Sequence, residues 1–171
     1  MDAPPRFAFR PATLDDLPLI AGWLAQPHVA QWWGDDATFD AEDLSDPRVD
    51  VRIVCRAGQP IGYMQDYDPH GWADHPLGFL PVGARGTDQF LGPADLLGQG
   101  LGPAFIAARM SELFGCGAPA VGTDPDPRNA RAIAAYRKAG FRSAGAASAG
   151  HWGPFLPMVA WAPGKAPGGA G

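Results

Sequence analysis

The feature that most restricts the fold of this chain is a glycine-rich segment, residues 97–103, with the sequence LGQGLGP. It follows a predicted strand (residues 87–91) and opens a predicted helix (residues 103–114). Alternate glycines let backbone amides approach a ligand closely because no Cβ intervenes, and Pro103 suits the first position of a helix. Free amides and the helix dipole together favour an anion such as phosphate. The glycines alone leave open a second interpretation, a tight strand-to-helix turn without a ligand.

Two known phosphate-binding loops do not match this segment. A Walker loop requires Gly-Lys followed by Ser or Thr, which is absent. A dinucleotide-binding fingerprint requires a third glycine at the position that Pro103 occupies. The segment therefore predicts an anion site of another kind.

The predicted elements follow the order strand, helices, three strands, helix, strand, helix, two strands. The predicted strands are 7–11, 51–56, 60–67, 87–91, 120–123, 141–146 and 155–161; the predicted helices are one capped by Thr13 and reaching Leu24, then 28–33, 103–114 and 129–139. This order predicts one α/β domain with a central sheet, residues 1–161. Residues 162–171 (APGKAPGGAG) are predicted to form a flexible tail. The loop 68–86 is long enough to favour a functional role.

Composition excludes several classes of protein. The 171 residues carry 18 acidic and 13 basic side chains, a net charge of −5, which argues against a nucleic-acid binder and favours a cationic small molecule as partner. Two cysteines give neither a disulfide framework nor a metal cluster. We find no secretory signal and no apolar run of about 18 residues, so we expect a soluble, cytoplasmic protein.

A second signal lies in the helix predicted at 129–139. Asn129, Ala132 and Tyr136 share one side of that helix, and Gly140 suits its C-terminal left-handed position. The helix is also basic, which fits either a phosphate contact or a solvated face. An isolated tyrosine at such a position is more often a core residue.

The glycine segment, followed by N-x-x-A-x-x-x-Y-x-x-x-G-F at 129–141, resembles the GCN5-related N-acetyltransferases. More narrowly, several blocks resemble the aminoglycoside 6'-N-acetyltransferases. In chain order they are HVAQWWG (28–34), PIGY (60–63), RGTDQFL (85–91), LGQGLG (97–102), TDPDP (123–127) and AGF (139–141). The blocks extend over nearly the whole chain, and their combination is much more specific than the superfamily motif alone.

This resemblance implies a mixed, mostly antiparallel central sheet flanked by helices. It also implies transfer of an acetyl group from acetyl-CoA to a primary amine, without a metal. The residues it implies for acetyl-CoA binding are Gln89, Phe90, Leu91, Gly98, Gln99, Gly100, Leu101, Gly102, Asn129 and Tyr136.

The resemblance also implies roles for individual side chains. Asp88 matches the proposed base of the family, acting directly or through water, and Tyr136 matches the residue that protonates the departing thiolate. Asp124 matches a second acidic position that lines the amine site. Aminoglycosides are polycations with sugar faces, so acids and aromatics should line their site. The implied substrate-binding residues are Trp32, Tyr63, Gln65, Asp66, Asp88 and Asp124; Trp33, Trp72 and Trp152 are further candidates.

Some residues depart from the family pattern. Gln99 stands where close relatives often carry lysine, and Trp152 stands near a position that is often acidic. Residues 68–84 also differ in length and chemistry.

Two alternatives therefore stay open. One is an acyltransferase for hydroxylysine in siderophore assembly, with His28 as part of the base. The other is a non-catalytic CoA-binding module, against which the presence of Asp88 and Tyr136 argues.

Overall fold

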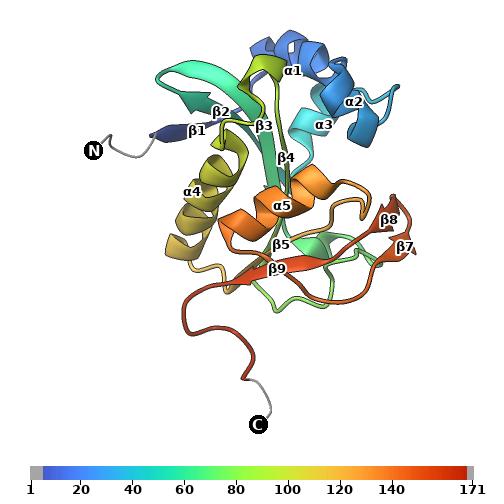
Figure 1. The fold of residues 1–171 in the computed structure, drawn as a ribbon, viewed down its shortest axis with the longest axis vertical. Coiled ribbons are helices and arrows are strands. Elements are labelled where there is room, and N and C mark those ends of the chain that lie inside the picture. The colour runs from blue at the N-terminus through green and yellow to red at the C-terminus, as the bar shows by residue number, and fades with distance from the viewer. Residues whose placement is uncertain (1–5, 169–171) are drawn as a thin grey trace. The chain divides into compact units, whose positions relative to one another are not determined.

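The computed structural model describes residues 6–168 (Figure 1). The strands are β1 (Phe7–Pro11), β2 (Val49–Arg56), β3 (Gln59–Tyr67), β4 (Arg85–Leu91), β5 (Ala120–Thr123), β6 (Arg142–Ser143), β7 (Ser148–Gly150), β8 (Gly153–Phe155) and β9 (Met158–Trp161). The α-helices are α1 (Leu17–Leu24), α2 (Pro27–Trp33), α3 (Ala41–Ser45), α4 (Leu101–Gly115) and α5 (Ala130–Ala139). Single-turn 3-10 helices lie at Leu14–Asp16, Pro69–Gly71 and Ala94–Leu96.

The strands form one seven-stranded sheet in the order β1-β2-β3-β4-β5-β9-β6, and β7 and β8 form a separate hairpin. Strands β4 and β5 pair in parallel, with Arg85 opposite Val121. The β1–β2, β5–β9 and β6–β9 pairs are antiparallel. The predicted fold class, a mixed and mostly antiparallel sheet flanked by helices, is confirmed.

The chain divides into two compact units, and the first comprises residues 1–66 and 88–105. Its core is built from the apolar faces of α1 and α2 and the inward-facing residues of β2, β3 and β4. The buried members are Ile20, Trp23, Leu24, Val29, Val51, Ile53, Cys55, Tyr63 and Phe90. The start of α1 is fixed by Asp16, which accepts from the backbone N–H of Thr13 at 2.8 Å and forms an ion pair with Arg10 at 2.7 Å. The bond from Arg10 lowers the pKa of Asp16 to about 2. Thr13 is the N-cap of the 3-10 helix Leu14–Asp16, which leads into α1, and the N-cap position of α1 itself is Asp16.

The second unit comprises residues 67–87 and 106–171. Its core contains Leu77 and Leu80, which are 0% and 3% exposed, together with residues of β5 and β9. A Cβ on Gly122 of β5 would meet both leucine side chains, so the glycine leaves room for them. Part of the long loop 68–86 therefore fills the core of this unit.

Several predicted elements differ from the structure in their bounds or their number. The predicted strand 155–161 is two strands, because β8 ends at Phe155 and β9 begins at Met158. Between them Leu156 donates its N–H to the carbonyl of Pro125, outside the sheet ladder. The β7–β8 hairpin was not predicted; its turn includes Gly153, which has a φ of +106°. The predicted strand 141–146 is reduced to β6, and α4 begins at Leu101 rather than Pro103.

The end of the chain is described as far as residue 168. Ala162 donates its N–H to the carbonyl of Pro119, and Lys165 donates to that of Ala162. Residues 169–171 of the predicted tail lie outside the described residues. The flexibility of the tail and the single-domain division remain predictions.

Candidate functional site

The glycine segment lies in unit 1 and leads directly into α4. Gly98 and Gly100 have positive φ angles of +76° and +75°, a conformation that favours glycine. A Cβ placed on Gly98, Gly100 or Gly102 would meet nothing within 4 Å. These glycines therefore do not make room for a packed side chain of the protein. Their backbone faces open space, which is what close approach by a ligand requires.

The side chains of this segment do not point uniformly outward. Leu101 is 5% exposed, so only its backbone is available to a ligand. The side-chain amide of Gln99 donates to the carbonyl of Asp95 at 2.8 Å. Gln99 therefore helps to close the loop rather than supplying the charge that a lysine there would bring.

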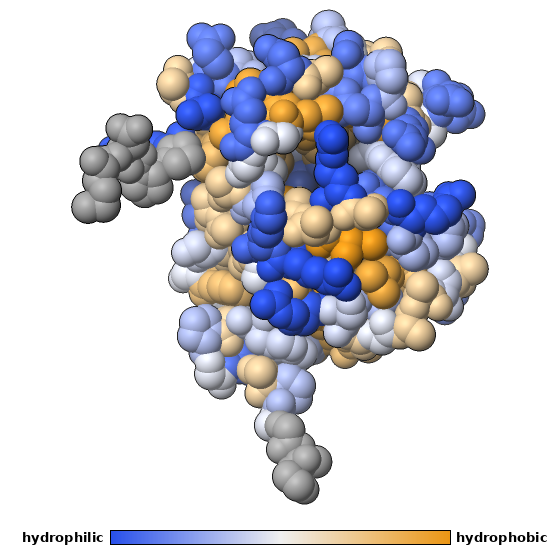
Figure 2. All heavy atoms as spheres, viewed as in Figure 1, coloured by the Kyte–Doolittle hydropathy of each residue, from blue (hydrophilic) through white to orange (hydrophobic). Residues whose placement is uncertain are grey.

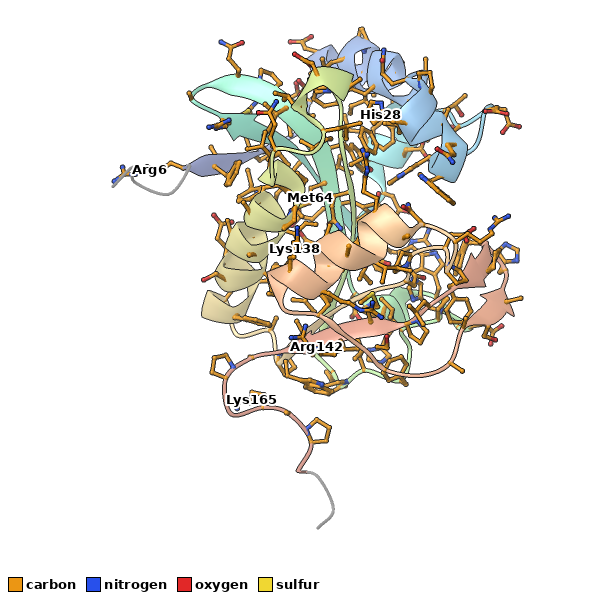
Figure 3. The ribbon with its side chains drawn as sticks, in the orientation of Figure 1. Arg6, His28, Met64, Lys138, Arg142 and Lys165 are labelled. Carbon is orange, nitrogen blue, oxygen red and sulfur yellow. The ribbon has the colours of Figure 1, made fainter. Side chains whose placement is uncertain are left out.

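The predicted strand for the cofactor, residues 89–91, is the end of β4. Gln89 and Leu91 are half-buried, whereas Phe90 is buried in the core of unit 1. The imidazole Nε2 of His28 (labelled in Figure 3) lies 2.9 Å from the carbonyl oxygen of Leu91. A carbonyl oxygen only accepts, so Nε2 carries the hydrogen and donates. His28 thus connects α2 to β4, and this nitrogen is not placed to act as a base.

Asp88 is half-buried on β4 and is held by a side chain of β3. The Nε2 of Gln65 donates to Oδ2 of Asp88 at 2.9 Å, and the hydroxyl of Tyr63 donates to Oε1 of Gln65 at 2.6 Å. The structure therefore brings together three predicted site residues as one relay, which we call the Tyr63–Gln65–Asp88 relay.

The ring of Tyr63 is fixed on several sides by aromatic side chains. It stacks on Phe90, with centroids 5.1 Å apart and planes 10° apart, and Trp33 and Phe39 meet it edge-on. Burial, and secondarily the carboxylates of Asp88 and Asp43, raises the pKa of Tyr63 above its ordinary value. The phenol therefore stays protonated and remains a donor at neutral pH.

Trp32 and Asp66 are two of the three predicted substrate-binding residues that lie outside this relay; the third is Asp124. Trp32 is half-buried, and it is its neighbour Trp33, with 36% of its surface exposed, that packs on Tyr63 and Phe90. Asp66 is only 1% exposed, so its carboxylate is not offered at the surface. Substrate binding by Trp32 and Asp66 remains a prediction.

Unit 2 holds the predicted residues of α5. Tyr136 is 6% exposed, and its ring meets Phe141 edge-on at a centroid distance of 5.4 Å. Asn129 caps the helix, because its Oδ1 accepts from the backbone N–H of Ala132 at 3.1 Å. The exposed side of α5 carries Arg131, Arg137 and Lys138, the last labelled in Figure 3, and Figure 2 shows hydrophilic and apolar residues side by side over this helix. A cofactor role for the Asn129 side chain would compete with its role as a cap.

Asp124 directly follows β5 and is half-buried. The turn after it is fixed by Asp126, whose carboxylate forms an ion pair with Arg128 at 2.6 Å. The carbonyl of Pro125 accepts from Leu156 at 2.8 Å. The backbone on the C-terminal side of Asp124 is thus held by two independent contacts.

Unit 2 also contains an aromatic cluster, defined here as Tyr67, Trp72, His75 and Trp152. His75 lies at its centre, with ring centroids 5.1 Å from Tyr67, 5.7 Å from Trp72 and 5.4 Å from Trp152. The backbone N–H of Leu77 donates to Nδ1 of His75 at 3.0 Å, and burial lowers the pKa of the ring. Trp152, at the turn of the β7–β8 hairpin, is 60% exposed. The sequence gives no signal for the place of His75 in this cluster, because no spacing along the chain links it to residue 152.

Residues 6–168 contain neither a cluster of metal-ligating side chains nor a membrane-spanning helix. No group of three or more His, Cys, Asp and Glu side chains there is arranged to hold a metal ion. No helix among these residues has the length and apolar character needed to cross a membrane.

Comparison with protein families gives one match over most of the chain. Residues 12–148 match the family described as acetyltransferase (GNAT) domain. A curated relative, aminoglycoside N(6')-acetyltransferase type 1 of Klebsiella pneumoniae, is 34% identical over 162 residues, covering 86% of this chain and 79% of the relative. A kanamycin resistance protein of Rhizobium radiobacter is 42% identical over 78 residues, covering 45% of this chain and 71% of the relative.

Solved structures give a similar result. AAC(6')-Ib in complex with paromomycin and acetyl-CoA is 33% identical, with a TM-score of 0.82 and coverage of 91% of this chain and 93% of that one. The same enzyme with coenzyme A and kanamycin is 32% identical, with a TM-score of 0.82 and coverage of 91% and 95%. An aminoglycoside N(6')-acetyltransferase from Legionella pneumophila, 24% identical with a TM-score of 0.75 and coverage of 94% of each chain, shares the fold.

Proposed function

Because this chain belongs to the GNAT acetyltransferase family, we propose that it transfers the acetyl group of acetyl-CoA to an aminoglycoside antibiotic and so confers resistance. The 6'-amine is the proposed acceptor. Support comes from relatives that are named aminoglycoside N(6')-acetyltransferase and kanamycin resistance protein. Further support comes from similar structures that contain acetyl-CoA or coenzyme A together with an aminoglycoside.

The glycine segment fits the phosphates of acetyl-CoA. Its positive-φ glycines present backbone without a Cβ, and the space beside them is open. We assign the backbone amides of residues 99–102 to the pyrophosphate and residues 89–91 to the pantetheine arm. The amides at the start of α4 lie at the positive end of the helix dipole, which favours a phosphate. No metal is required.

The side chains of this protein are assigned the proton transfers of the reaction. Acetyl-CoA, when bound, supplies a thioester whose carbonyl carbon is attacked by the amine, forming the C–N bond and breaking the C–S bond. Asp88 takes the proton that the ammonium loses, directly or through a water molecule. The Tyr136 hydroxyl donates its proton to the departing sulfur. Asp124 binds an ammonium group of the substrate through charge attraction.

The observation that carries this proposal is the carboxylate of Asp88, half-buried on β4 and held through Oδ2 by Gln65. A half-buried carboxylate that is held in one orientation by a hydrogen bond is well placed to bind a cation. The hydroxylysine alternative offered His28 as half of a His–Asp base, and His28 Nε2 is instead a donor to the carbonyl of Leu91. We also propose a cytoplasmic location, where acetyl-CoA is available.

The test is release of free thiol from acetyl-CoA with several acceptors side by side. We expect turnover with kanamycin and other drugs that carry a free 6'-amine, and none with a drug that carries a hydroxyl there. Raising the salt concentration should weaken the apparent affinity, because screening reduces attraction between cation and acid. Turnover of hydroxylysine without turnover of kanamycin would assign the chain to the alternative activity.

The cofactor site has its own test, built on two helical glycines in open space. A Cβ added to Gly102 in α4 or to Gly22 in α1 would meet nothing within 4 Å, and neither glycine has a positive φ. Each change to alanine should stabilise the free protein by about 0.5–1 kcal/mol, because glycine costs conformational entropy in a helix. Only Gly102→Ala should reduce the rise in melting temperature caused by acetyl-CoA. Equal rises in both variants would contradict the proposed phosphate site.

A further inference from the structure

Resting on the proposed function, we propose that Gln65 is a positioning residue for Asp88, oriented in turn by Tyr63. Sequence reasoning placed Gln65 among the residues that touch the substrate. The structure instead places its amide between a buried phenol and the carboxylate, at 2.6 Å from one and 2.9 Å from the other. Through this relay a residue remote from the reacting atoms sets how Asp88 meets the amine.

The direction of each hydrogen bond follows from chemistry. An ionised carboxylate only accepts, so the group that faces Asp88 must be the amide nitrogen of Gln65. The amide oxygen then faces Tyr63, whose hydroxyl donates to it. Reversing the amide would bring its oxygen within 2.9 Å of a carboxylate oxygen, with two acceptors in contact. The relay therefore has one satisfactory arrangement.

The start of the relay is rigid. Tyr63 is 1% exposed and is stacked on Phe90, the second residue after Asp88 on β4. On β3, Tyr63 and Gln65 are two residues apart, so their side chains point to the same side of the strand. The aromatic packing fixes the phenol, the phenol fixes the amide, and the amide fixes Oδ2 of Asp88.

Two consequences follow for the reaction. A donor to Oδ2 stabilises the ionised carboxylate, the form that accepts a proton. It also restricts rotation of the carboxylate before the amine arrives, which removes an ordering cost from the reaction step. The carboxylates of Asp88 and of Asp43 on α3 both act on Tyr63 at the start of the relay and help to raise the pKa of its phenol.

The first experiment measures steady-state kinetics and pH–rate profiles. Gln65→Met keeps the length of the side chain but removes the donor, and Gln59→Met, at an exposed position of the same strand, is the matched control. We expect Gln65→Met to lower kcat by about 10-fold, the value of a hydrogen bond to a charged group, with KM for the drug changed less than kcat. The acidic limb of the kcat/KM profile should move to higher pH. Gln59→Met should match the wild type.

Tyr63→Phe tests whether Tyr63 and Gln65 act as a relay or independently of each other. Alone, it should shift the acidic limb in the same direction as Gln65→Met but by less. Combined with Gln65→Met it should add no further loss, because Tyr63 acts through the amide that the first change removes. Additive losses, or an acidic limb that stays in place in both single variants, would overturn the proposal.

The second experiment does not require turnover. In the free wild-type protein, the side-chain NH2 resonances of Gln65, assigned by their loss in Gln65→Met, should shift as Asp88 titrates. They should not do so in Asp88→Asn. Chemical shifts of the Gln65 NH2 group that stay constant while Asp88 titrates would overturn the relay. A wild-type protein that acetylates no aminoglycoside would refute the proposed function, and this titration would still decide the relay.

Discussion

Two tyrosines four residues apart on β3 illustrate two uses of buried aromatic rings. Tyr63 in unit 1 and Tyr67 in unit 2 are 1% and 3% exposed. The neighbours of Tyr63 hold its hydroxyl against an amide, and the amide holds a carboxylate. The neighbours of Tyr67 lead through His75 to Trp152, which is 60% exposed. The first region, around Tyr63, orients the charged carboxylate of Asp88. The second region, the aromatic cluster around His75, exposes an aromatic ring at the surface. If the proposed function is right, changes in the first region should alter kcat, whereas changes in the aromatic cluster and at Asp124 should alter KM.

The largest effect is expected from Asp88→Asn in the first region. The side chain is nearly isosteric, so the variant should fold and bind acetyl-CoA as the wild type does. Its kcat should fall by on the order of 10²–10⁴, the usual value of a positioned base. Raising the pH should restore part of the loss, because the free amine becomes more abundant. Kinetics across pH, with folding checked by circular dichroism, provide the measurement.

A second carboxylate, Asp124 in unit 2, should behave differently. Asp124→Asn should raise KM for the drug by about 10-fold and lower kcat less, because a charge contact present throughout the reaction is uniform binding. The same kinetic series measures it. A kcat that collapses in Asp124→Asn while Asp88→Asn stays near normal would show that the two roles are reversed.

Substitution of Trp152, the exposed member of the aromatic cluster, should change KM by no more than substitution of Asp124 does. Trp152→Ala should raise KM for aminoglycosides by about 3- to 10-fold, the value of one lost aromatic contact, and leave kcat almost unchanged. Phe79→Ala, at an exposed aromatic position of unit 2 outside the cluster, is the control. Measurement across several drugs should show unequal losses, because the sugars differ. A loss of activity in Trp152→Ala that lies only in kcat would contradict the proposed difference between the two regions.

The smallest effect concerns stability and His75. Burial lowers the pKa of this ring in the folded protein, so the unfolded chain binds a proton more readily. Stability contributed by the neutral ring is therefore lost as the pH falls through its ordinary value of about 6.5. His75→Gln should reduce the drop in melting temperature between pH 7.5 and pH 5.5 by about 2–4 °C at most. An equal reduction in His151→Gln would assign the effect to surface charge.

The sequence indicated the family and the fold because both depend on local signals. Alternating strands, the Thr13 cap and the glycine segment before a helix can each be read within a few residues. The glycine at the end of α5 is another such signal; Gly140 has the left-handed conformation expected of it, with a φ of +111°.

The side-chain relay was not predictable in the same way. Gln65 and Asp88 are 23 residues apart in the chain, and their contact depends on how β3 and β4 are placed side by side. The choice between Trp32 and Trp33 depends on the rotation of α2, which one residue changes by about 100°. The β7–β8 hairpin was missed because its strands are only three residues each (SAG and GPF) and consist mostly of glycine, alanine, serine and proline, without an alternating apolar pattern.

The central claim is acetyl transfer to one particular amine, and the most direct measurement locates the acetyl group in the product. Kanamycin is incubated with acetyl-CoA and the protein, and the product is examined by mass spectrometry and by NMR correlation of the new amide. We predict a single added acetyl group on the 6'-nitrogen, and formation of the same product by Asp88→Asn at a rate lower by on the order of 10²–10⁴. An acetyl group on another amine, or an unmodified drug, would contradict the proposed function.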